Sequence, residues 1–485
     1  MHLSYRASSA IAVCIAMVCS LQSASSADSP NFLVIMADDL GYGDLGCTGS
    51  ESIKTPHIDQ LAASGTVFTQ AYVASAVCSP SRAGFMTGRD PRRFGYEGNL
   101  NSGAENYATR PELLGLPTTE HTLGDQLKKV GYRTGIVGKW HLGLSDRFHP
   151  NNRGFDYFCG MRNGGHDYFP RQGKNRIERN GEPVKEFSSP YLTDFFSDEA
   201  VRWIEKPTDK PWFLFLSYNA PHTPMQATEA DLKVFAHIKD NKRQTYAAMV
   251  HAMDRGIGRV LAALDQTEQT NNTFVVFLSD NGGATNNGSW NGNLSGAKGS
   301  LLEGGIRVPM IWRWPARVPT GKQSATVVSS LDLLPTFLAA ADASPLPLNP
   351  PASHEDARNC KRMLELCGQY DGINVMPLIA ENAQAKPQRD PPLFWRLQGQ
   401  AAMLQGEQKL IRLSHRPAQL FHPASDPGEQ ADLAPHHPAE LQQAFKLLGS
   451  WEAALPTVPL WDSSPYWHGD SAKIYDTWQP RPEPK

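Results

Sequence analysis

The chain has 485 residues, of which 40% are hydrophobic and 20% charged, as in an ordinary globular protein. Its 46 basic and 49 acidic side chains leave a net charge of −3, which argues against nucleic acid as a partner. The length suits one large domain together with a smaller one.

The first 27 residues have the pattern of a secretory signal peptide. Arg6 supplies a positive charge, residues 10–19 are apolar, and Ser25 and Ala27 are small residues suited to cleavage before Asp28. The apolar run is shorter than the roughly 20 residues that a membrane span needs, although a retained anchor is the alternative. We expect an exported protein with no membrane attachment after cleavage, periplasmic or secreted in a bacterium, or lysosomal in a eukaryote.

Apolar runs rich in β-branched and aromatic residues alternate with helix-like segments along the next 290 or so positions. The runs predict strands at residues 31–39, 132–141, 211–222, 272–282 and 308–315. Helices are predicted at residues 121–131 and 245–266. This alternation predicts an α/β fold with a large, mainly parallel central sheet between helices.

The composition changes towards the C-terminus. Residues 342–358 are rich in proline, serine and alanine and predict a surface loop, and residues 387–392 form a second break. Four short strand-like runs and a helix-like stretch at 438–455 follow. The predicted organisation is a signal peptide at 1–27, a catalytic domain at 28–386, and a C-terminal subdomain with an antiparallel sheet and a helix at 387–485.

Five cysteines remain after the predicted cleavage, namely Cys47, Cys78, Cys159, Cys360 and Cys367. An odd number leaves at least one thiol unpaired. The last two are seven positions apart, which on a continuous helix is about 10.5 Å along the axis and too far for a disulfide. They can pair with each other only if their segment is not helical throughout.

Four predicted strands end in polar clusters. These clusters are Asp38-Asp39, Lys139 to His141, Asn219 to His222, and Asp280-Asn281. Open α/β sheets bind ligands beyond the carboxyl ends of their strands. The repeated placement therefore predicts one site assembled from several strand ends.

Asp38, Asp39, Asp280 and Asn281 offer only oxygen ligands, which suit Ca²⁺ or Mg²⁺ better than zinc. Adjacent strand residues point to opposite faces, so the two neighbouring aspartates can reach one ion only if the backbone leaves the strand there. The glycines at positions 41 and 43 permit such a departure. Ordinary turn chemistry of Asp and Asn before glycine is the alternative.

Four cationic or titratable residues are candidates for binding an anion beside this metal, namely Lys139, His141, His222 and Lys298. A tetrahedral anion on a divalent cation needs donors around its other oxygens, and a histidine can act as acid or base. Each residue alone also has a simpler interpretation, as a solvated lysine, a hydrogen-bonded histidine or part of a flexible linker.

The stretch CSPSRAGFMTGR, residues 78–89, predicts a helix with a cysteine at its N-terminus. Pro80 suits the first turn and Gly88 suits the end. A thiol at this position has a lowered pKa, and anions bind there. Arg82 lies one turn on, on the same face. The local pattern predicts a reactive thiolate at an anion site, with a buried structural cysteine as the alternative.

The same stretch resembles the sulfatase signature C-x-P-S-R-x-x-x-x-T-G-R. Further segments match that family, namely MADDLGYGDLGCTG, GKWHLG, NAPHTP, SDNGG and LFHPASDPGEQADLA. The resemblance covers almost the whole mature chain and is strongest to the branch with arylsulfatase A and N-acetylgalactosamine-6-sulfatase. It implies an alkaline-phosphatase-like fold.

The resemblance also implies site roles, position by position. It implies one Ca²⁺ ion, with Mg²⁺ as the alternative, held by Asp38, Asp39, Asp280, Asn281 and the modified Cys78. It implies that a formylglycine-generating enzyme converts Cys78 to Cα-formylglycine, whose hydrate is the nucleophile and forms a covalent sulfate ester. Further implied roles are stabilisation of the hydrate by Arg82 and Lys139, sulfate binding and assistance to the leaving alcohol by Lys298 and His222, and proton acceptance by His141.

The resemblance implies hydrolysis of sulfate monoesters, with a sulfated saccharide of the galactosamine or galactose type as the expected substrate. The alternatives are a phosphate or phosphonate monoester hydrolase of the same superfamily and a noncatalytic glycan-binding protein. Family members often carry a hydroxyl residue where this chain has Gly165, before His166-Asp167, so that sulfate contact is absent or comes from Asn163 or His166.

The pocket walls are expected from residues 90–120, 160–185 and the C-terminal subdomain. Tyr96, Trp290 and Trp395 are candidates for stacking on a sugar, with ordinary core or loop aromatics as the alternative.

Overall fold

The computed structural model describes residues 29–100, 114–170, 176–348, 370–379, 389–414, 416–455, 474–475 and 483–484. The predicted signal peptide, Cys360 and Cys367 lie outside these residues. Within them, the structure has no helix that is both long enough and apolar enough to cross a membrane.

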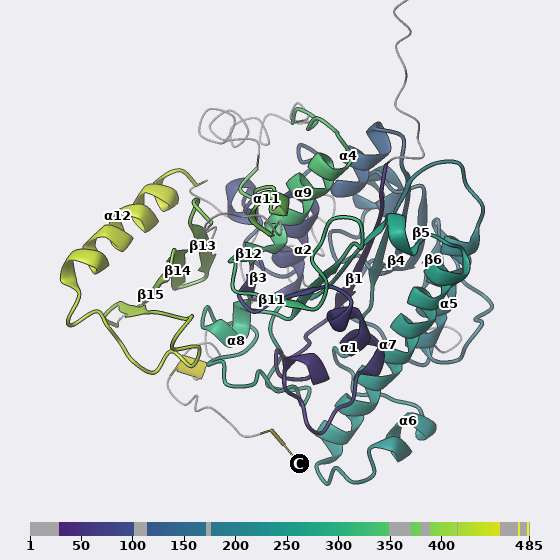
Figure 1. Cartoon of the computed structure of the whole chain (residues 1–485), viewed down its shortest axis with the longest axis horizontal. Coiled ribbons are helices and arrows are strands. Elements are labelled where there is room, and N and C mark those ends of the chain that lie inside the picture. The colour runs from purple at the N-terminus through teal and green to yellow at the C-terminus, as the bar shows by residue number, and fades with distance from the viewer. Residues whose placement is uncertain are drawn as a thin grey trace, which may run out of the picture.

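A ten-stranded sheet forms the centre of the molecule (Figure 1). Its strand order is β11-β2-β10-β9-β1-β8-β4-β5-β6-β7. The central strands are β1 (Asn31–Ala37), β8 (Trp212–Ser217), β9 (Thr273–Ser279), β4 (Arg133–Lys139) and β5 (Tyr157–Met161). These five run parallel to their neighbours within the group. The prediction of a mainly parallel sheet is thus confirmed.

Shorter strands extend the sheet on both sides and bring in the antiparallel pairings. They are β10 (Met310–Arg313), β2 (Thr66–Phe68), β11 (Lys322–Ser324), β6 (Glu178–Arg179) and β7 (Glu182–Pro183). The predicted strand at 308–315 is therefore present as β10, but it runs antiparallel to β9. A separate two-stranded pair joins β3 (Ala71–Tyr72) and β12 (Val328–Ser329).

Helices cover both faces of the sheet, because alternate residues of each buried strand point to opposite sides. Leu33 and Ile35 of β1 belong to a core with α1 (Pro56–Ala63), α5 (Leu192–Glu205) and α7 (Asn241–Gln266). Phe32 and Val34 belong to the opposite core. That core includes residues of α2 (Cys78–Thr87), α4 (Leu123–Lys129), α9 (Leu333–Ala340) and α11 (Met376–Ile379).

The two predicted helices are present with shifted ends. α4 falls inside the predicted range 121–131, and its Thr122 and Asp125 form a capping box. α7 begins four residues before the predicted start at 245, because the Asp240 side chain accepts a hydrogen bond from the backbone N–H of Arg243 and caps the helix. Two short helices, α6 (Glu229–Val234) and α8 (Glu303–Ile306), also belong to the part of the chain predicted as the catalytic domain, hereafter the catalytic part.

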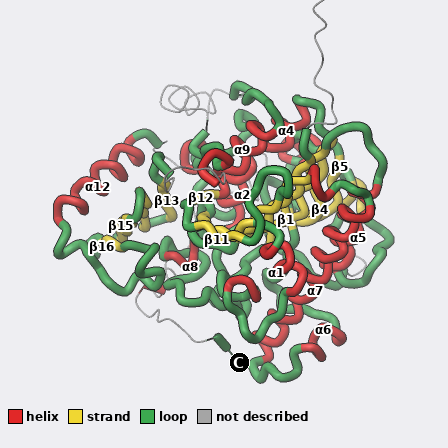
Figure 2. Tube along the Cα trace, in the orientation of Figure 1, coloured by secondary structure: helices red, strands yellow, loops and turns green. Residues whose placement is uncertain are grey.

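A four-stranded antiparallel sheet lies to one side of the large sheet, and Figure 2 shows its strands apart from the central ones. It consists of β13 (Leu393–Leu397), β14 (Gln400–Gln405), β15 (Gln408–Leu413) and β16 (Gln419–Phe421). Met403 and Leu410 pack with α12 (Pro438–Ala453) on one face. The predicted small antiparallel sheet with a helix is therefore confirmed.

Trp395 lies in the core between this small sheet and the catalytic part. It is 1% exposed, and its indole N–H donates to the backbone oxygen of Val73 at 2.8 Å. Tyr96 is fully buried as well, with its hydroxyl 2.6 Å from Ser79 Oγ. The prediction that these two rings stack on a sugar is wrong, and they are core aromatics. Trp290 is half-buried.

Candidate functional site

The polar strand ends predicted from the sequence meet at one edge of the large sheet. β9, β1, β8 and β4 are consecutive neighbours and parallel, so Asp280, Asp38, Tyr218 and Trp140 follow four adjacent carboxyl ends. Lys139 is the last residue of β4. The strand order therefore explains how residues as far apart as Asp39 and Asn281, 242 positions, contribute to one site.

Asp38 and Asp39 both face this site. Asp39 has a φ of 62°, in the left-handed region, and this local turn presents both carboxylates to Cys78. The Cys78 sulfur lies 3.6 Å from Asp38 Oδ1 and 3.7 Å from Asp39 Oδ1. The expected departure from the strand is present, but it occurs at Asp39 itself. Gly41 is needed for a different reason. A Cβ at this position would lie 2.4 Å from the Trp290 carbonyl oxygen, so only glycine fits there without a shift of the backbone.

Cys78 is the first residue of α2, and the helix ends at Gly88 with a φ of 64°, as the sequence predicts. The chemical state differs from the prediction of a thiolate. Burial raises the pKa of the Cys78 thiol, even though Lys139 and Lys298 act in the opposite direction. The desolvation cost of a buried thiolate, together with the nearby carboxylates of Asp280 and Asp39, exceeds the effect of the two lysines. The unmodified thiol is therefore protonated and a weak nucleophile.

Arg82 connects three of the strand ends. Its Nε donates to Asp280 Oδ2 at 2.8 Å, and its Nη1 donates to Ser217 Oγ at 2.6 Å and to the Lys139 backbone oxygen at 3.2 Å. Its Nη2 is buried and has no hydrogen-bond partner in the described part of the chain. Ser217 was not predicted as a site residue, although its place as the last residue of β8 is the signal that identifies it.

Two lysines each form an ion pair with one of the two neighbouring aspartates. Lys139 Nζ lies 2.7 Å from Asp38 Oδ2, and Lys298 Nζ lies 2.8 Å from Asp39 Oδ2 and 3.1 Å from the Cys78 sulfur. Both lysines are buried. For Lys298, burial lowers the pKa while Asp39 and Asp38 raise it, and the net effect is a raised pKa. Both predicted cations thus belong to the site.

His222 and His141 differ in how closely they approach the carboxylates. His222 Nε2 lies 3.6 Å from Asp39 Oδ2, and burial lowers the pKa of this imidazole. His141 has a φ of 59°, and its Nε2 lies 3.0 Å from the Leu100 backbone oxygen. Burial and Lys139 hold the pKa of His141 well below 6.5, and its Nδ1 is buried without a partner among the described residues.

Three carboxylates converge at this edge of the sheet. The Asp39 backbone N–H donates to Asp280 Oδ1 at 3.2 Å, and Asn281 Nδ2 donates to Asp39 Oδ1 at 2.7 Å. Burial, together with the charge of Asp38, raises the pKa of Asp280 to about 6. Arg82, Lys139 and Lys298 supply the positive charge that compensates these three closely spaced carboxylates.

The donors fit a hard divalent cation. Asn281 Oδ1 is buried and has no hydrogen-bond partner in the described part of the chain, so one neutral oxygen stands free beside the carboxylates. Possible ligand atoms of Asp38, Asp39, Cys78 and His222 lie within 4.8 Å of one another. Carboxylate and amide oxygens favour Ca²⁺ or Mg²⁺. His222 was predicted to bind an anion, and the structure also places it within reach of the same cation.

Gly165 lies beside His222, as a Cβ there would be 3.6 Å from His222 Cε1. Gly164 approaches the other histidine, with its Cβ position 2.6 Å from His141 Nε2. His166 is engaged locally, since its Nδ1 lies 2.7 Å from the Asp167 backbone oxygen and its Nε2 accepts from the Arg176 N–H. Within the predicted wall segment 160–185, Gly164 and Gly165 therefore lie against the two histidines of the site.

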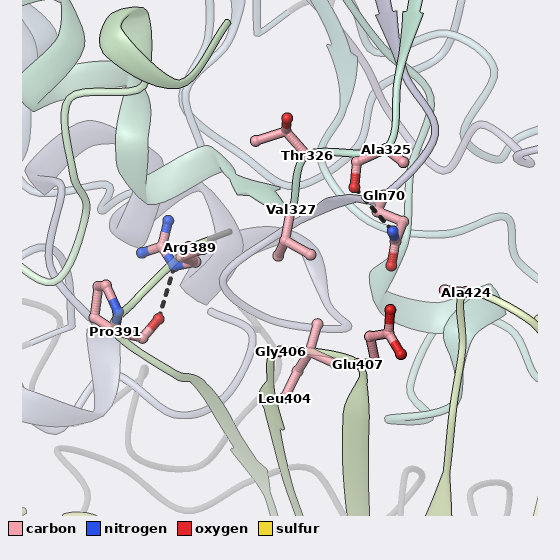
Figure 3. Close-up of a pocket in the computed structure, with 10 residues that line it drawn as sticks. All are labelled: Gln70, Ala325, Thr326, Val327, Arg389, Pro391, Leu404, Gly406, Glu407 and Ala424. Atoms are coloured by element: carbon pink, nitrogen blue, oxygen red, sulfur yellow. Dashed lines mark hydrogen bonds between the residues drawn. The ribbon is translucent and has the colours of Figure 1, made fainter. Parts of the chain in front are cut away.

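The structure also contains a cavity of about 290 Å³ between the catalytic part and the small sheet (Figure 3). Gln70 and Val327 line one side, and Leu404 and Glu407 line the other. None of the predicted site residues lines it. The predicted chemistry therefore belongs to the edge of the large sheet and not to this cavity.

A family model for sulfatases matches residues 30–343. The chain is 36% identical to N-acetylgalactosamine-6-sulfatase of Mus musculus over 394 residues, which cover 77% of this chain and 70% of that protein. This chain belongs to the sulfatase family. Members of this family are sulfuric ester hydrolases, and the predicted resemblance is confirmed.

Other relatives agree with the family. The chain is 36% identical to N-acetylgalactosamine-6-sulfatase of Canis lupus familiaris, covering 67% of this chain and 65% of that protein. It is 32% identical to human steryl-sulfatase, covering 74% of this chain and 71% of that protein. The chain thus spans about two thirds of the length of these curated relatives.

Solved structures confirm the fold. The crystal structure of Ps i-CgsB in complex with k-i-k-neocarrahexaose has a TM-score of 0.79 and 38% identity, covering 92% of this chain and 99% of that chain. The phosphonate monoester hydrolase of Agrobacterium radiobacter has a TM-score of 0.58 at 19% identity, which shows a shared fold alone. The alkaline-phosphatase-like fold class is therefore confirmed.

Proposed function

We propose that this protein hydrolyses sulfate monoesters on sulfated sugars, with Cys78 as the position of the nucleophile. The observation that carries the proposal is the buried cluster around the Cys78 sulfur, with Lys298 Nζ at 3.1 Å and two carboxylates within 3.7 Å. A protonated thiol in this setting has little reactivity of its own. The sulfatase signature implies that a formylglycine-generating enzyme converts it to Cα-formylglycine.

The hydrate of that aldehyde has two hydroxyl groups, which explains why such a residue suits the reaction. One hydroxyl oxygen would bond to sulfur as the S–O bond to the alcohol breaks, with the hydroxyl proton passing to the leaving alcohol. This would give a sulfate ester on residue 78. The second hydroxyl then loses its proton, the carbonyl re-forms, and the C–O bond to sulfate breaks. A serine ester lacks this second hydroxyl and depends on attack by water.

The resemblance to sulfatases implies roles for the remaining residues, and their positions around Cys78 support these roles. Lys298 and His222 bind sulfate oxygens and assist the leaving alcohol, and Arg82 and Lys139 hold the hydrate. The lowered pKa of His141 keeps its imidazole neutral at pH 7, which is the form that accepts the proton released when the sulfate ester breaks down. Its unpartnered Nδ1 is available for this transfer.

We propose that Asp38, Asp39, Asp280 and Asn281, with residue 78, hold one Ca²⁺ ion. When bound, the ion neutralises the converging carboxylates and polarises sulfate oxygens as a Lewis acid. The charge balance supports this proposal. Three buried carboxylates face the cations Arg82, Lys139 and Lys298, and a sulfate monoester adds one further negative charge, which a bound cation would offset.

A sulfated saccharide is the proposed substrate because of the relatives. Five curated N-acetylgalactosamine-6-sulfatases are 34–36% identical to this chain, and the neighbouring crystal structure of Ps i-CgsB holds a neocarrahexaose. We therefore propose a galactosamine or galactose sulfate. The predicted signal peptide at 1–27 leads us to propose that the enzyme meets this substrate after export.

The test compares turnover of 4-nitrophenyl sulfate with that of 4-nitrophenyl phosphate by the matured protein. We expect a higher kcat/KM for the sulfate ester, and faster phosphate turnover would overturn the proposal. A panel of defined sulfated galactose and galactosamine saccharides, read out as released sulfate, then identifies the sugar. Release from glucosamine sulfates alone would contradict the proposed sugar while leaving the reaction intact.

A further inference from the structure

A second cleft lies at the opposite edge of the large sheet from the catalytic cluster. It has a volume of about 650 Å³ and includes Arg133, the first residue of β4. Lys139, at the catalytic end of the same strand, is six residues away, which is about 20 Å along a strand. The cleft is therefore separate from the catalytic site.

Positive charge predominates in this cleft. The lining contains four cations, which are Arg133, Arg179, Arg202 and Lys206, and two carboxylates, which are Asp156 and Glu199. The net charge of these six is 4 − 2 = +2. An anion is therefore the complementary ligand.

The two carboxylates are already engaged. Glu199 is 3% exposed, and its carboxylate pairs with both Arg179 and Arg202 while accepting a hydrogen bond from Tyr157. Asp156 pairs with Lys128 at 2.6 Å. Arg133 and Lys206 therefore have no carboxylate ion pair within the described residues.

Arg133 is a preorganised cation. Its guanidinium carbon lies 4.0 Å from the centre of the Trp203 indole, and its two Nη atoms donate to the backbone oxygens of Lys206 and Trp203. Its Nε is buried and has no partner among the described residues. Burial lowers the pKa of Arg133, and the charge of Asp156 opposes this by raising it. A bound anion would compensate this partly desolvated charge.

We propose that this cleft is a second, noncatalytic binding site for a sulfate group of a sulfated polysaccharide. The polymer as ligand rests on the proposed function, while the preference for an anion rests on the cleft itself. Binding a polymer at a second point raises its effective concentration at the catalytic site. Small sulfate esters gain nothing from such a site, because they cannot reach both places.

The test uses Arg202→Gln/Lys206→Gln, a double variant of two exposed side chains. The matched control is Lys239→Gln/Lys242→Gln, which removes the same charge from exposed positions elsewhere. The probe is fluorescent dextran sulfate, with neutral dextran as the reference polymer. We expect about a tenfold loss of dextran sulfate affinity in the cleft variant, which corresponds to about 1.4 kcal/mol, and no change in the control.

Kinetics give the second measurement. Turnover of 4-nitrophenyl sulfate should be unchanged in both double variants, and KM for a sulfated polysaccharide should rise in the cleft variant alone with kcat unchanged. If the double variant unfolds, the single variant Lys206→Glu should still show weaker dextran sulfate binding and a higher KM for the polysaccharide. Equal dextran sulfate affinity in cleft and control variants would overturn the cleft proposal. Absence of 4-nitrophenyl sulfate turnover in the unaltered protein would instead overturn the proposed function.

Discussion

At the scale of single residues, backbone conformation decides which side chains reach the site. Asp39 and His141 are non-glycine residues with φ values of 62° and 59°, directly after β1 and β4. Such conformations are uncommon for these residues and concentrate at functional sites. The sequence predicts Asp39 and His141 as site residues, but no residue pattern specifies a left-handed φ at these two positions. The sequence therefore identifies both residues, but it places the turn after β1 at the glycines 41 and 43, whereas the structure has it at Asp39.

Two neighbouring glycines provide a test at this scale. A Cβ at Gly165 would meet His222 at ordinary contact distance, so Gly165→Ala should retain 4-nitrophenyl sulfate turnover within a few-fold. A Cβ at Gly164 would lie 2.6 Å from His141 Nε2 and force that ring to move. Gly164→Ala should therefore reduce kcat for 4-nitrophenyl sulfate by about 10²–10⁴-fold, which is the usual contribution of a positioned proton acceptor. Equal kcat values for the two variants would contradict the assigned place of His141.

At the scale of elements, the small C-terminal sheet supports the loop that carries Lys298. Gln400, at the start of β14, is 6% exposed. Its Nε2 donates to the Gly299 backbone oxygen at 3.1 Å, and its Oε1 accepts from the Leu301 N–H at 3.3 Å and the Tyr475 hydroxyl at 2.6 Å. One side chain thus holds two backbone positions, Gly299 and Leu301, directly after a cation of the site.

We predict that Gln400→Ala loosens this loop and moves Lys298 away from the sulfate. The expected result is about a tenfold or larger fall in kcat/KM for 4-nitrophenyl sulfate, since loss of oriented contacts of about 1.4 kcal/mol has that effect. Gln405→Ala is the matched control, because Gln405 is exposed on the same strand. A Gln400→Ala protein with a lowered Tm and unchanged kcat/KM would show that Gln400 has a structural role alone.

A second element-scale feature concerns the start of α1. Thr55, before the helix, makes no side-chain cap. Asp254 of α7 supplies it instead, accepting hydrogen bonds from the backbone N–H groups of His57 at 3.3 Å and Ile58 at 2.8 Å. A cap that comes from a residue 196 positions away has no local pattern in the sequence, so the sequence does not predict it.

The pKa of Asp254 leads to a pH prediction. Burial raises it from 3.8 to about 6. A carboxyl with a folded-state pKa above its unfolded value stabilises the protein fully below about pH 4, and this contribution is lost as pH rises through 6. The free energy of unfolding should therefore fall by about 1 kcal/mol from pH 5 to 7.5 through this group. Asp254→Asn should show a smaller fall over this range in urea titrations, and an equal fall would contradict the assignment.

At the scale of the whole molecule, strand order is the property that the local sequence does not contain. The predicted central strands are confirmed, and the polar residues after them meet because β9, β1, β8 and β4 are neighbours. Apolar runs identify strands but not which strands pair, so the distances around Cys78 could not be predicted. Burial in the assembled fold also reversed the expected shift of the Cys78 pKa.

Convergence of the carboxylates predicts a metal-dependent fold. Removal of Ca²⁺ with EGTA should lower the Tm, by the equivalent of about 3 kcal/mol if the ion is present at 100 times its Kd. Added Ca²⁺ should restore it more fully than Mg²⁺. Asp280→Asn should reduce the change in Tm caused by EGTA and by added Ca²⁺, because it removes one of the three carboxylates. A Tm that is indifferent to EGTA and to both cations would contradict the metal site.

The central claim is that residue 78 is the nucleophile of a sulfatase and does not act as a thiol. The most direct measurement is sulfate release from 4-nitrophenyl sulfate by the Cys78→Ala protein, beside Cys47→Ala, which removes another free cysteine of the chain. We predict that Cys78→Ala releases no sulfate above the uncatalysed rate while Cys47→Ala retains activity. Persistent sulfate release by the Cys78→Ala protein would contradict the account.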